Sequence, residues 1–230
     1  MFIEESIWIS KILKQADLRE NQSVLDLGSS TESFRCLDQP FIDYHIFRPL
    51  RNKGIRVIHV DSKKSEGVDI VCDLSSVDSE EIIRQMKPSD VVICANFLEH
   101  VVDRNLVLAR VKMLTKAGGL IIITVPYRYR YHEDPIDTLY RPSNIELEEL
   151  FAGENYQKIA SEILEVQAEP DIIPAPKKSL FVRFLRRIQR AFRWDYKSEQ
   201  PNVILNQVSV LAMRKPVDDS PLTRATGSEA

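Results

Sequence analysis

The stretch Val24-Leu25-Asp26-Leu27-Gly28-Ser29-Ser30 decides the fold of this chain. It reads as a short apolar strand that carries an acidic residue near its end and breaks at a glycine. In an open α/β sheet, such a strand end presents backbone N–H groups and a carboxylate to a nucleoside ligand. The stretch therefore predicts a ligand site at the carboxyl end of the first strand.

Four further apolar stretches follow along the chain, and two of them close on an aspartate. Their bounds are 57–61, 68–73, 90–94 and 118–126. Segments with helical signals separate the strands, over 2–20, 79–87, 104–116 and 143–151. This alternation predicts an α/β fold with a mainly parallel sheet and helices on both faces.

Individual residues mark the predicted helices. Ile7, Ile12 and Leu13 recur at helical spacing in the first one. Ser79 and Ser143 are predicted N-caps, because a serine side chain accepts from the free N–H groups of a helix start. The connection between the first two strands is long, and Pro40 is expected to break any helix in it.

The end of the chain departs from simple alternation. Strands are predicted near 158–166 and over 203–212, separated by a Pro-rich and basic insertion over 168–202. Residues 1–215 are interpreted as a single domain, and 216–230 as a disordered tail.

Three segments carry a resemblance to a known family. Asn96-Phe97-Leu98-Glu99-His100-Val101 follows the fourth strand, and Lys116-Ala117-Gly118-Gly119 precedes the fifth. The run 132–141 is similar to an H-x-x-P-x-D-x-x-x-R pattern. Together they resemble the class I S-adenosylmethionine (SAM)-dependent methyltransferases, in particular the bacterial group with a Leu-Glu-His-Val element, over roughly 20–152. The resemblance implies a Rossmann-like, mainly parallel seven-stranded sheet with helices on both faces and an antiparallel last strand.

The resemblance also implies SAM as the cofactor. The predicted cofactor-binding residues are Asp26, Gly28, Ser30, Asp61, Asp73 and Asn96. Asp61 is expected to accept hydrogen bonds from the ribose hydroxyls, as an acid at this position does in dinucleotide folds. Asp73 is expected beside the adenine, with Asp26 and Gly28 facing the methionine part. A nicotinamide-dinucleotide site is disfavoured, because only the first glycine of G-x-G-x-x-G is present.

The acceptor is predicted to be a polar small molecule, a saccharide or a glycolipid, methylated on oxygen. Histidine is the natural base near neutral pH, and His132 follows the fifth strand, so His132 and Asp137 form the predicted catalytic group. Tyr127, Tyr131 and Arg141 are the predicted substrate-binding residues. No metal-ligand spacing is evident, which predicts metal-independent transfer.

Alternatives stay open at two of these positions. His100 is interpreted as a cap of the following helix, a partner of the Gly28 loop, or a group near the methyl being transferred. The family's glycine-rich loop usually reads G-x-G-x-G, whereas this chain has Gly28, Ser30 and Glu32. That departure supports a second hypothesis, a non-catalytic methyltransferase-like scaffold or binding protein.

Composition places the chain among ordinary globular proteins, with 43% hydrophobic and 28% charged residues. No apolar run reaches the ~20 residues of a membrane span. Cys72 and Cys94 fall in predicted buried strands, so reduced core thiols and a cytoplasmic location are expected.

The net charge of −3 conceals one basic segment. Residues 177–197 contain eight Lys and Arg against one Asp, so the rest of the chain is acidic and no nucleic-acid partner is expected. Residues 178–194 form a predicted basic amphipathic helix. It is interpreted as an anchor to an anionic membrane surface, with packing on the domain, or binding of an acidic partner or a nucleic acid, as alternatives.

Overall fold

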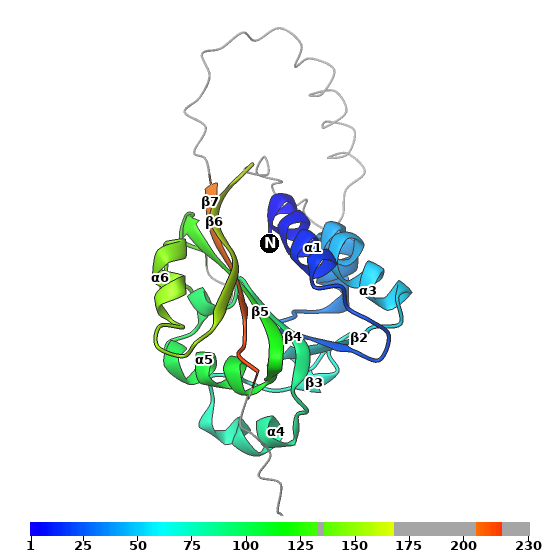
Figure 1. The fold of residues 1–230 in the computed structure, drawn as a ribbon. Helices are drawn as coiled ribbons and strands as arrows, with labels where there is room; N and C mark the ends of the chain where they lie inside the picture. The colour runs from blue at the N-terminus through cyan, green and yellow to red at the C-terminus, as the bar shows by residue number, and fades with distance from the viewer. Residues whose placement is uncertain (133–135, 168–205, 218–230) are drawn as a thin grey trace, which may run out of the picture.

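The computed structural model describes residues 1–132, 136–167 and 206–217, and within them seven strands form one sheet (Figure 1). The strand order is β3-β2-β1-β4-β5-β7-β6. The strands are β1 (Ser23–Leu27), β2 (Arg56–Asp61), β3 (Ile70–Val71), β4 (Ser89–Ala95), β5 (Thr115–Arg128), β6 (Gln157–Val166) and β7 (Asn206–Arg214). Strands β1 to β5 pair in parallel, and β7 is antiparallel to both of its neighbours. The predicted sheet with an antiparallel last strand is confirmed.

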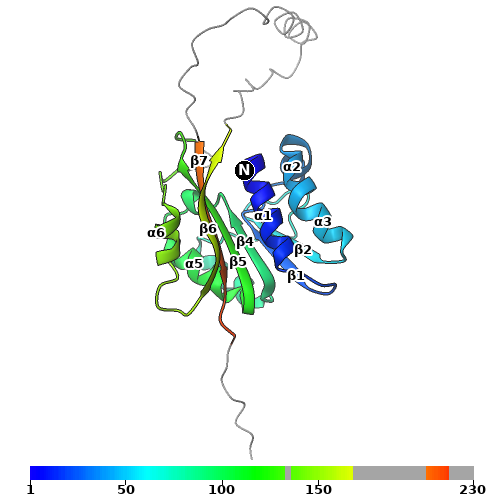
Figure 2. The same cartoon turned by 45° about the horizontal axis from the view of Figure 1, so that its top comes forward.

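Helices cover both faces of the sheet, as predicted (Figure 2). On one face lie α1 (Ile3–Gln15), α2 (Pro40–Ile42) and α3 (Arg48–Asn52). On the other lie α4 (Glu80–Gln85), α5 (Arg104–Met113) and α6 (Asn144–Glu149).

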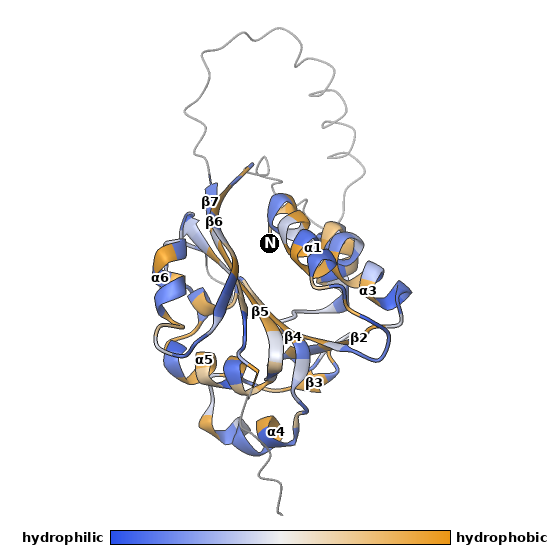
Figure 3. Ribbon diagram, viewed as in Figure 1, coloured by the Kyte–Doolittle hydropathy of each residue, from blue (hydrophilic) through white to orange (hydrophobic). Residues whose placement is uncertain are grey.

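Two hydrophobic cores result, one on each face, because successive strand side chains point to opposite faces. In β1, Val24 packs toward α1, whereas Leu25 and Leu27 pack toward α4 and α5. The central strands β4 and β5 alternate in the same way, so their middle residues, 91–94 and 120–123, are all apolar (Figure 3). Burial on both faces explains why these strands read as continuous apolar runs in the sequence.

The long connection after β1 forms short helical pieces. Two π-helical turns, η1 (Phe34–Asp38) and η2 (Asp43–Phe47), alternate with α2 and α3. Pro40 occupies the first turn of α2, where its missing N–H has no partner to lose, so it divides the segment as predicted. Ile42, Ile46 and Phe47 bury this connection against the core beneath α1.

Several predicted bounds change. The first helix ends at Gln15, and Ile7 is 50% exposed because Trp8, Ile9, Ile12 and Leu13 form the buried face. Helix α5 ends at Met113, because Thr115 already begins β5.

The predicted serine caps have different outcomes. Ser143 caps α6 with its side chain, as predicted. Ser79 is the N-cap residue of α4, as predicted, but its side chain makes no capping hydrogen bond. The side-chain cap lies one turn earlier: Ser76 accepts from the N–H of Asp78 and starts η3 (Val77–Ser79), a 3-10 turn that leads into α4 and that was not predicted.

The basic insertion over 168–202, including the predicted 178–194 helix, lies outside the described residues, as do 133–135, 203–205 and 218–230. Within the described ranges, no helix is both long and apolar enough to cross a membrane. The described cysteines are all unpaired, and Cys72 and Cys94 are buried, as predicted.

Candidate functional site

A cavity of about 710 Å³ opens at the carboxyl ends of the central parallel strands. This volume is within the usual range of small-molecule sites, about 300–1,000 Å³. The lining includes all six predicted cofactor residues, Asp26, Gly28, Ser30, Asp61, Asp73 and Asn96. These six residues therefore lie together at one wall of the cavity, and their role in binding a cofactor stays a prediction.

Asp61 ends β2 and holds the turn that follows β1. Its Oδ2 accepts from the N–H of Ser30 at 2.7 Å, and its Oδ1 accepts from the N–H of Lys63 at 2.9 Å. A carboxylate offers about four lone-pair sites. Each oxygen of Asp61 therefore keeps acceptor capacity for a pair of hydroxyl groups in the cavity.

The turn at Gly28 and Ser30 adopts left-handed backbone conformations, with φ of +71° and +55°. The N–H groups of Gly28 and Ser29 both donate to the carbonyl of Val60. A Cβ on Gly28 would lie 2.5 Å from Cδ2 of Phe97. Glycine is needed here for its conformational freedom and for the close approach of this ring.

Arg35, for which the sequence predicted no role, holds the same turn through hydrogen bonds. Its buried guanidinium donates to the carbonyls of Ser29 and Ser30 at 2.8 Å each, and to Gly67 at 2.6 Å. Three backbone carbonyls thus share one charged donor. No local pattern marks this role, because Arg35 lies in a π-helical turn of the long connection.

Glu32 points away from the cavity. Its side chain is exposed, it is absent from the cavity lining, and its N–H donates to the carbonyl of Glu66. The third position of the expected glycine pattern therefore adds neither bulk nor charge to the ligand space.

Asp26 and Asp73 are each partly engaged. Oδ2 of Asp26 lies 2.9 Å from Nδ1 of His59, its neighbour in register on β2. Oδ1 of Asp73 accepts from the N–H and the hydroxyl of Ser75. Both carboxylates are therefore oriented by the protein before any ligand arrives.

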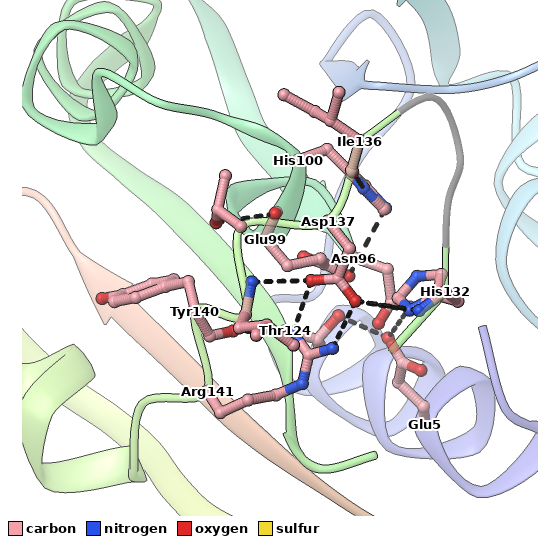
Figure 4. Close-up of polar contacts among 12 residues, drawn as sticks. Glu5, Asn96, Glu99, His100, Thr124, His132, Ile136, Asp137, Tyr140 and Arg141 are labelled. Atoms are coloured by element: carbon pink, nitrogen blue, oxygen red, sulfur yellow. Dashed lines mark hydrogen bonds and ion pairs between the residues drawn. The ribbon is translucent and has the colours of Figure 1, made fainter. Parts of the chain in front are cut away.

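Asn96, after β4, is held by a buried acid from the first helix (Figure 4). Its Nδ2 donates to Oε1 of Glu5 at 2.7 Å, and the hydroxyl of Thr124 donates to the same oxygen. Oε2 of Glu5 accepts from the N–H of Phe2 at 3.0 Å. The sequence could have indicated that Glu5 is buried, because Glu5 lies three residues before Trp8 and therefore on the same face of the helix.

On the opposite wall, Asp137 holds the loop that contains His132. It accepts from Arg141 at 2.6 Å and 3.1 Å, and from the N–H groups of His132 and Leu139. Burial alone would raise the pKa of Asp137, but the Arg141 guanidinium and the two N–H groups outweigh it and lower the pKa. Asp137 is therefore an anionic anchor.

His132 lines the cavity, and its Nδ1 lies 3.2 Å from Oδ2 of Asp137. Burial and the neighbouring His100 lower the pKa of His132, against the opposing effect of Asp137. The imidazole is therefore neutral near pH 7.

His100 also lines the cavity, in contact with the same loop. Its Nδ1 is bonded to the carbonyl of Ile136. The prediction that His100 caps the following helix is wrong, because Asp103 caps α5 by accepting from the N–H of Leu106. The predicted bond to the Gly28 loop is replaced by the Ile136 bond.

Glu99 is completely buried at the cavity wall. Neither carboxylate oxygen has a hydrogen-bond partner among the described residues. Burial raises its pKa to about 8, and nearby Glu5 acts in the same direction. Glu99 belongs to the Leu-Glu-His-Val element, and the sequence alone predicts no role for it.

The predicted substrate residues lie elsewhere. Tyr127, Tyr131 and Arg141 are absent from the cavity lining. Tyr131 is 57% exposed, and Arg141 is turned toward Asp137. Tyr129 lines the cavity instead, with its ring edge-on to that of His132 at 5.2 Å. A role for the first three in substrate binding stays a prediction.

The fold has counterparts among solved structures. The MccD protein has a TM-score of 0.52 and 13% identity, over 90% of this chain and 96% of that chain. Coclaurine N-methyltransferase, bound to N-methylheliamine and S-adenosylhomocysteine, has a TM-score of 0.51 and 16% identity, over 92% and 71%. The Burkholderia thailandensis 1,6-didemethyltoxoflavin-N1-methyltransferase, with bound 1,6-didemethyltoxoflavin and S-adenosylhomocysteine, has a TM-score of 0.50 and 18% identity, over 92% and 78%.

The sequence matches no protein-family model and none of the curated proteins. The structural match nevertheless extends over about nine-tenths of the chain, with strand order β3-β2-β1-β4-β5-β7-β6 and an antiparallel β7. The chain has the class I SAM-dependent methyltransferase fold.

Proposed function

We propose that this protein is a SAM-dependent methyltransferase. One observation carries the proposal: all six residues expected to bind the cofactor line a single cavity at the carboxyl edge of this sheet. The crevice outside the carboxyl ends of the strands is where open α/β sheets bind nucleotides. The cavity volume and the acceptor oxygens of Asp61 fit a nucleoside with a ribose diol.

When bound, SAM would supply the methyl group, with the electron pair of the broken S–CH3 bond left on sulfur in S-adenosylhomocysteine. The chain's own contribution is alignment and exclusion of water. Asp61 would hold the ribose, Asp73 would lie at the adenine side, and the turn at Gly28 and Ser30 would allow close approach of the ligand.

On the acceptor side, His132 takes the proton that a hydroxyl acceptor loses as its oxygen bonds to the methyl carbon. Its place at the cavity wall and its support by Asp137 favour this role. Tyr129 and His100 add aromatic and polar surface beside it. We therefore propose O-methylation of a polar acceptor, a small molecule, a saccharide or a glycolipid.

A non-catalytic scaffold is the second candidate, because the turn is already saturated. The N–H groups of Gly28, Ser29 and Ser30 all donate within the chain. A fold that uses these donors internally offers fewer to a ligand's carboxylate.

Calorimetry with S-adenosylhomocysteine separates the two candidates. Wild-type protein should bind it in the micromolar range, and D61N should weaken binding about 10- to 100-fold, since each lost charge-assisted hydrogen bond contributes roughly 1.5–3 kcal/mol. D78N, which changes an exposed aspartate outside the cavity, is the matched control. Absence of binding at millimolar ligand would refute the enzyme proposal.

Turnover across a panel of glycans, hydroxylated metabolites and amines then identifies the acceptor. The H132Q variant should retain cofactor binding and lose most transfer to a hydroxyl. Full activity of H132Q on the true acceptor would remove His132 from the mechanism.

The protein is further proposed to work at the cytoplasmic face of an anionic membrane, through the 178–194 segment that lies outside the described residues. Eight basic residues over 177–197 support it. Co-sedimentation with anionic liposomes should fall with added salt and with R186E, R187E and R190E together. Equal sedimentation of both forms would contradict it.

A further inference from the structure

We propose that Glu99, His100 and His132 form a binding site for a divalent transition-metal ion at the acceptor end of the cavity. Each residue offers one ligand atom, and these atoms lie within 4.8 Å of one another. All three residues line the cavity, and they lie together in Figure 4. Bonds of about 2 Å in tetrahedral geometry place ligand atoms about 3.3 Å apart. Rotations of the side chains that move the ligand atoms by about 1 Å therefore close the site.

The first argument is the state of Glu99. It is completely buried, yet both of its oxygens lack a partner among the described residues. Asp137 is already neutralised by Arg141, so that guanidinium is committed elsewhere. A buried carboxylate is stable when it is paired or coordinates a metal. A cation at the cavity wall supplies what the surrounding protein does not.

The second argument is the orientation of His100. A carbonyl oxygen can only accept, so Nδ1 of His100 donates its hydrogen to Ile136. Nε2 therefore carries the free lone pair, and it lies 3.8 Å from Oε1 of Glu99. A histidine that donates one ring N–H to a backbone carbonyl and presents the other nitrogen is the usual arrangement of a metal ligand.

His132 is held at the cavity wall by its backbone. Asp137 accepts from the backbone N–H of His132 and lies 3.2 Å from its Nδ1 without forming a hydrogen bond to the ring. The ring lies edge-on to that of His100, at 5.1 Å between centroids. Nδ1 is buried and has no hydrogen-bond partner among the described residues, so this ring still has a nitrogen available to an ion.

The ligand set indicates the class of ion. Two imidazoles and one carboxylate suit Zn²⁺ and similar first-row ions, whereas Mg²⁺ and Ca²⁺ prefer oxygen ligands. Three protein ligands leave a position open toward the cavity, as in catalytic zinc sites.

An occupied site changes the chemistry proposed above. An acceptor hydroxyl at the open position loses its proton more readily, because the ion stabilises the resulting oxygen anion. The proton then leaves to solvent, and His132 serves as a ligand instead of a base. The site itself follows from geometry alone and stands whether or not the chain transfers methyl groups.

The test uses full-length protein freed of metal with a chelator and titrated with Zn²⁺ by calorimetry, with Co²⁺ absorption as a second readout. We expect one ion per chain and at least 100-fold weaker binding for each of E99Q, H100Q and H132Q. H45Q is the matched control, because His45 lies outside this cavity. Thermal unfolding of every variant in the absence of metal confirms that it is folded.

Zn²⁺ binding that is unchanged in E99Q, or absent from wild-type protein, would overturn the proposal and leave Glu99 a buried neutral acid. S-adenosylhomocysteine binding to the metal-free protein is measured in parallel. A chain that binds Zn²⁺ and not this ligand keeps the metal site and loses the methyltransferase proposal, and the reverse result does the opposite.

Discussion

The two walls of the cavity differ in how fully their polar groups are partnered. On the wall formed by β1 and β2, Asp61 and the turn at Ser29 and Ser30 bond to one another, to nearby backbone or to Arg35. On the wall after β4 and β5, Glu99 has no partner, and Nδ1 of His132 makes no hydrogen bond, among the described residues.

Within the described part of the chain, this difference separates a wall where Asp61 and the Ser29–Ser30 turn have partners from one where a buried carboxylate has none. Buried polar groups in folded proteins almost always have partners, so the exceptions call for an explanation. The first wall is organised by the chain alone and presents a fixed surface to a cofactor. The second is organised around Asp137 and Arg141, yet it leaves ligand atoms unused.

The largest effect is expected at Arg35. R35M removes one guanidinium and leaves the carbonyls of Ser29 and Gly67 without this donor, while the carbonyl of Ser30 keeps only the hydroxyl of Ser29. Each unpaired buried carbonyl costs roughly 1–3 kcal/mol, so unfolding free energy should fall by about 3–5 kcal/mol. Urea unfolding measures this. The exposed R19M is the control, with a change below about 0.5 kcal/mol. A small effect of R35M would show that the first wall does not depend on this side chain.

The second prediction tests whether Asp137 holds the second wall in place. D137N leaves the Arg141 charge nearly buried without its partner, which should lower the unfolding free energy by about 2–4 kcal/mol. The double variant D137N/R141Q should recover part of that loss, because it removes the stranded charge. Urea unfolding of the three proteins gives the coupling. Strict additivity of the two changes would contradict the anchor role.

Alanine substitutions at two glycines separate the cost of backbone strain from the cost of a steric clash. Gly28 and Gly153 both have left-handed φ angles, but a Cβ on Gly153 meets nothing within 4 Å. G153A should cost about 1 kcal/mol, and G28A about 2–4 kcal/mol, the excess being the clash with Phe97. Calorimetric melting measures both. Equal losses would mean that Phe97 moves aside freely.

The smallest effect is expected at Asp90, which lies at the start of β4, at the end of the strand that is far from the cavity. Burial would raise the pKa of Asp90, but bonds from Lys116, Ser23 and Gln22 lower it. Its stabilisation is therefore present above the unfolded pKa of about 4 and is lost as pH falls below it. D90N should cost about 1–2 kcal/mol at pH 7. Urea unfolding at pH 7 and pH 3 should show the difference shrinking in acid, and a constant difference would contradict it.

The first wall was predictable from the sequence, since its signals are local. Apolar runs that close on Asp61 and Asp73, and one that carries Asp26 just before its end, place those residues near strand ends, and parallel strands bring their ends to one edge. Gly28 marks the break in the same way. Arg35 was not predicted, because it lies in an irregular segment whose path no periodicity describes.

The second wall was predictable only in part. The motifs singled out His132, Asp137 and His100, but Tyr129 lines the cavity where Tyr127 and Tyr131 were expected. The alternation of tyrosines and arginines after β5 does not reveal which residues face inward, because the strand ends at Arg128. Beyond a strand end, period two no longer determines the direction of a side chain.

The sequence by itself determined the order of strands and helices and the residues at the strand ends, since both depend on neighbours within a few positions. The tertiary structure alone decided which polar groups are satisfied. Glu5 meets Asn96 and Thr124, 91 and 119 residues away, and is fully bonded. Glu99, equally buried, has no hydrogen-bond partner among the described residues. Whether a buried carboxylate finds a partner depends on the packing of distant elements, and no local pattern contains that information.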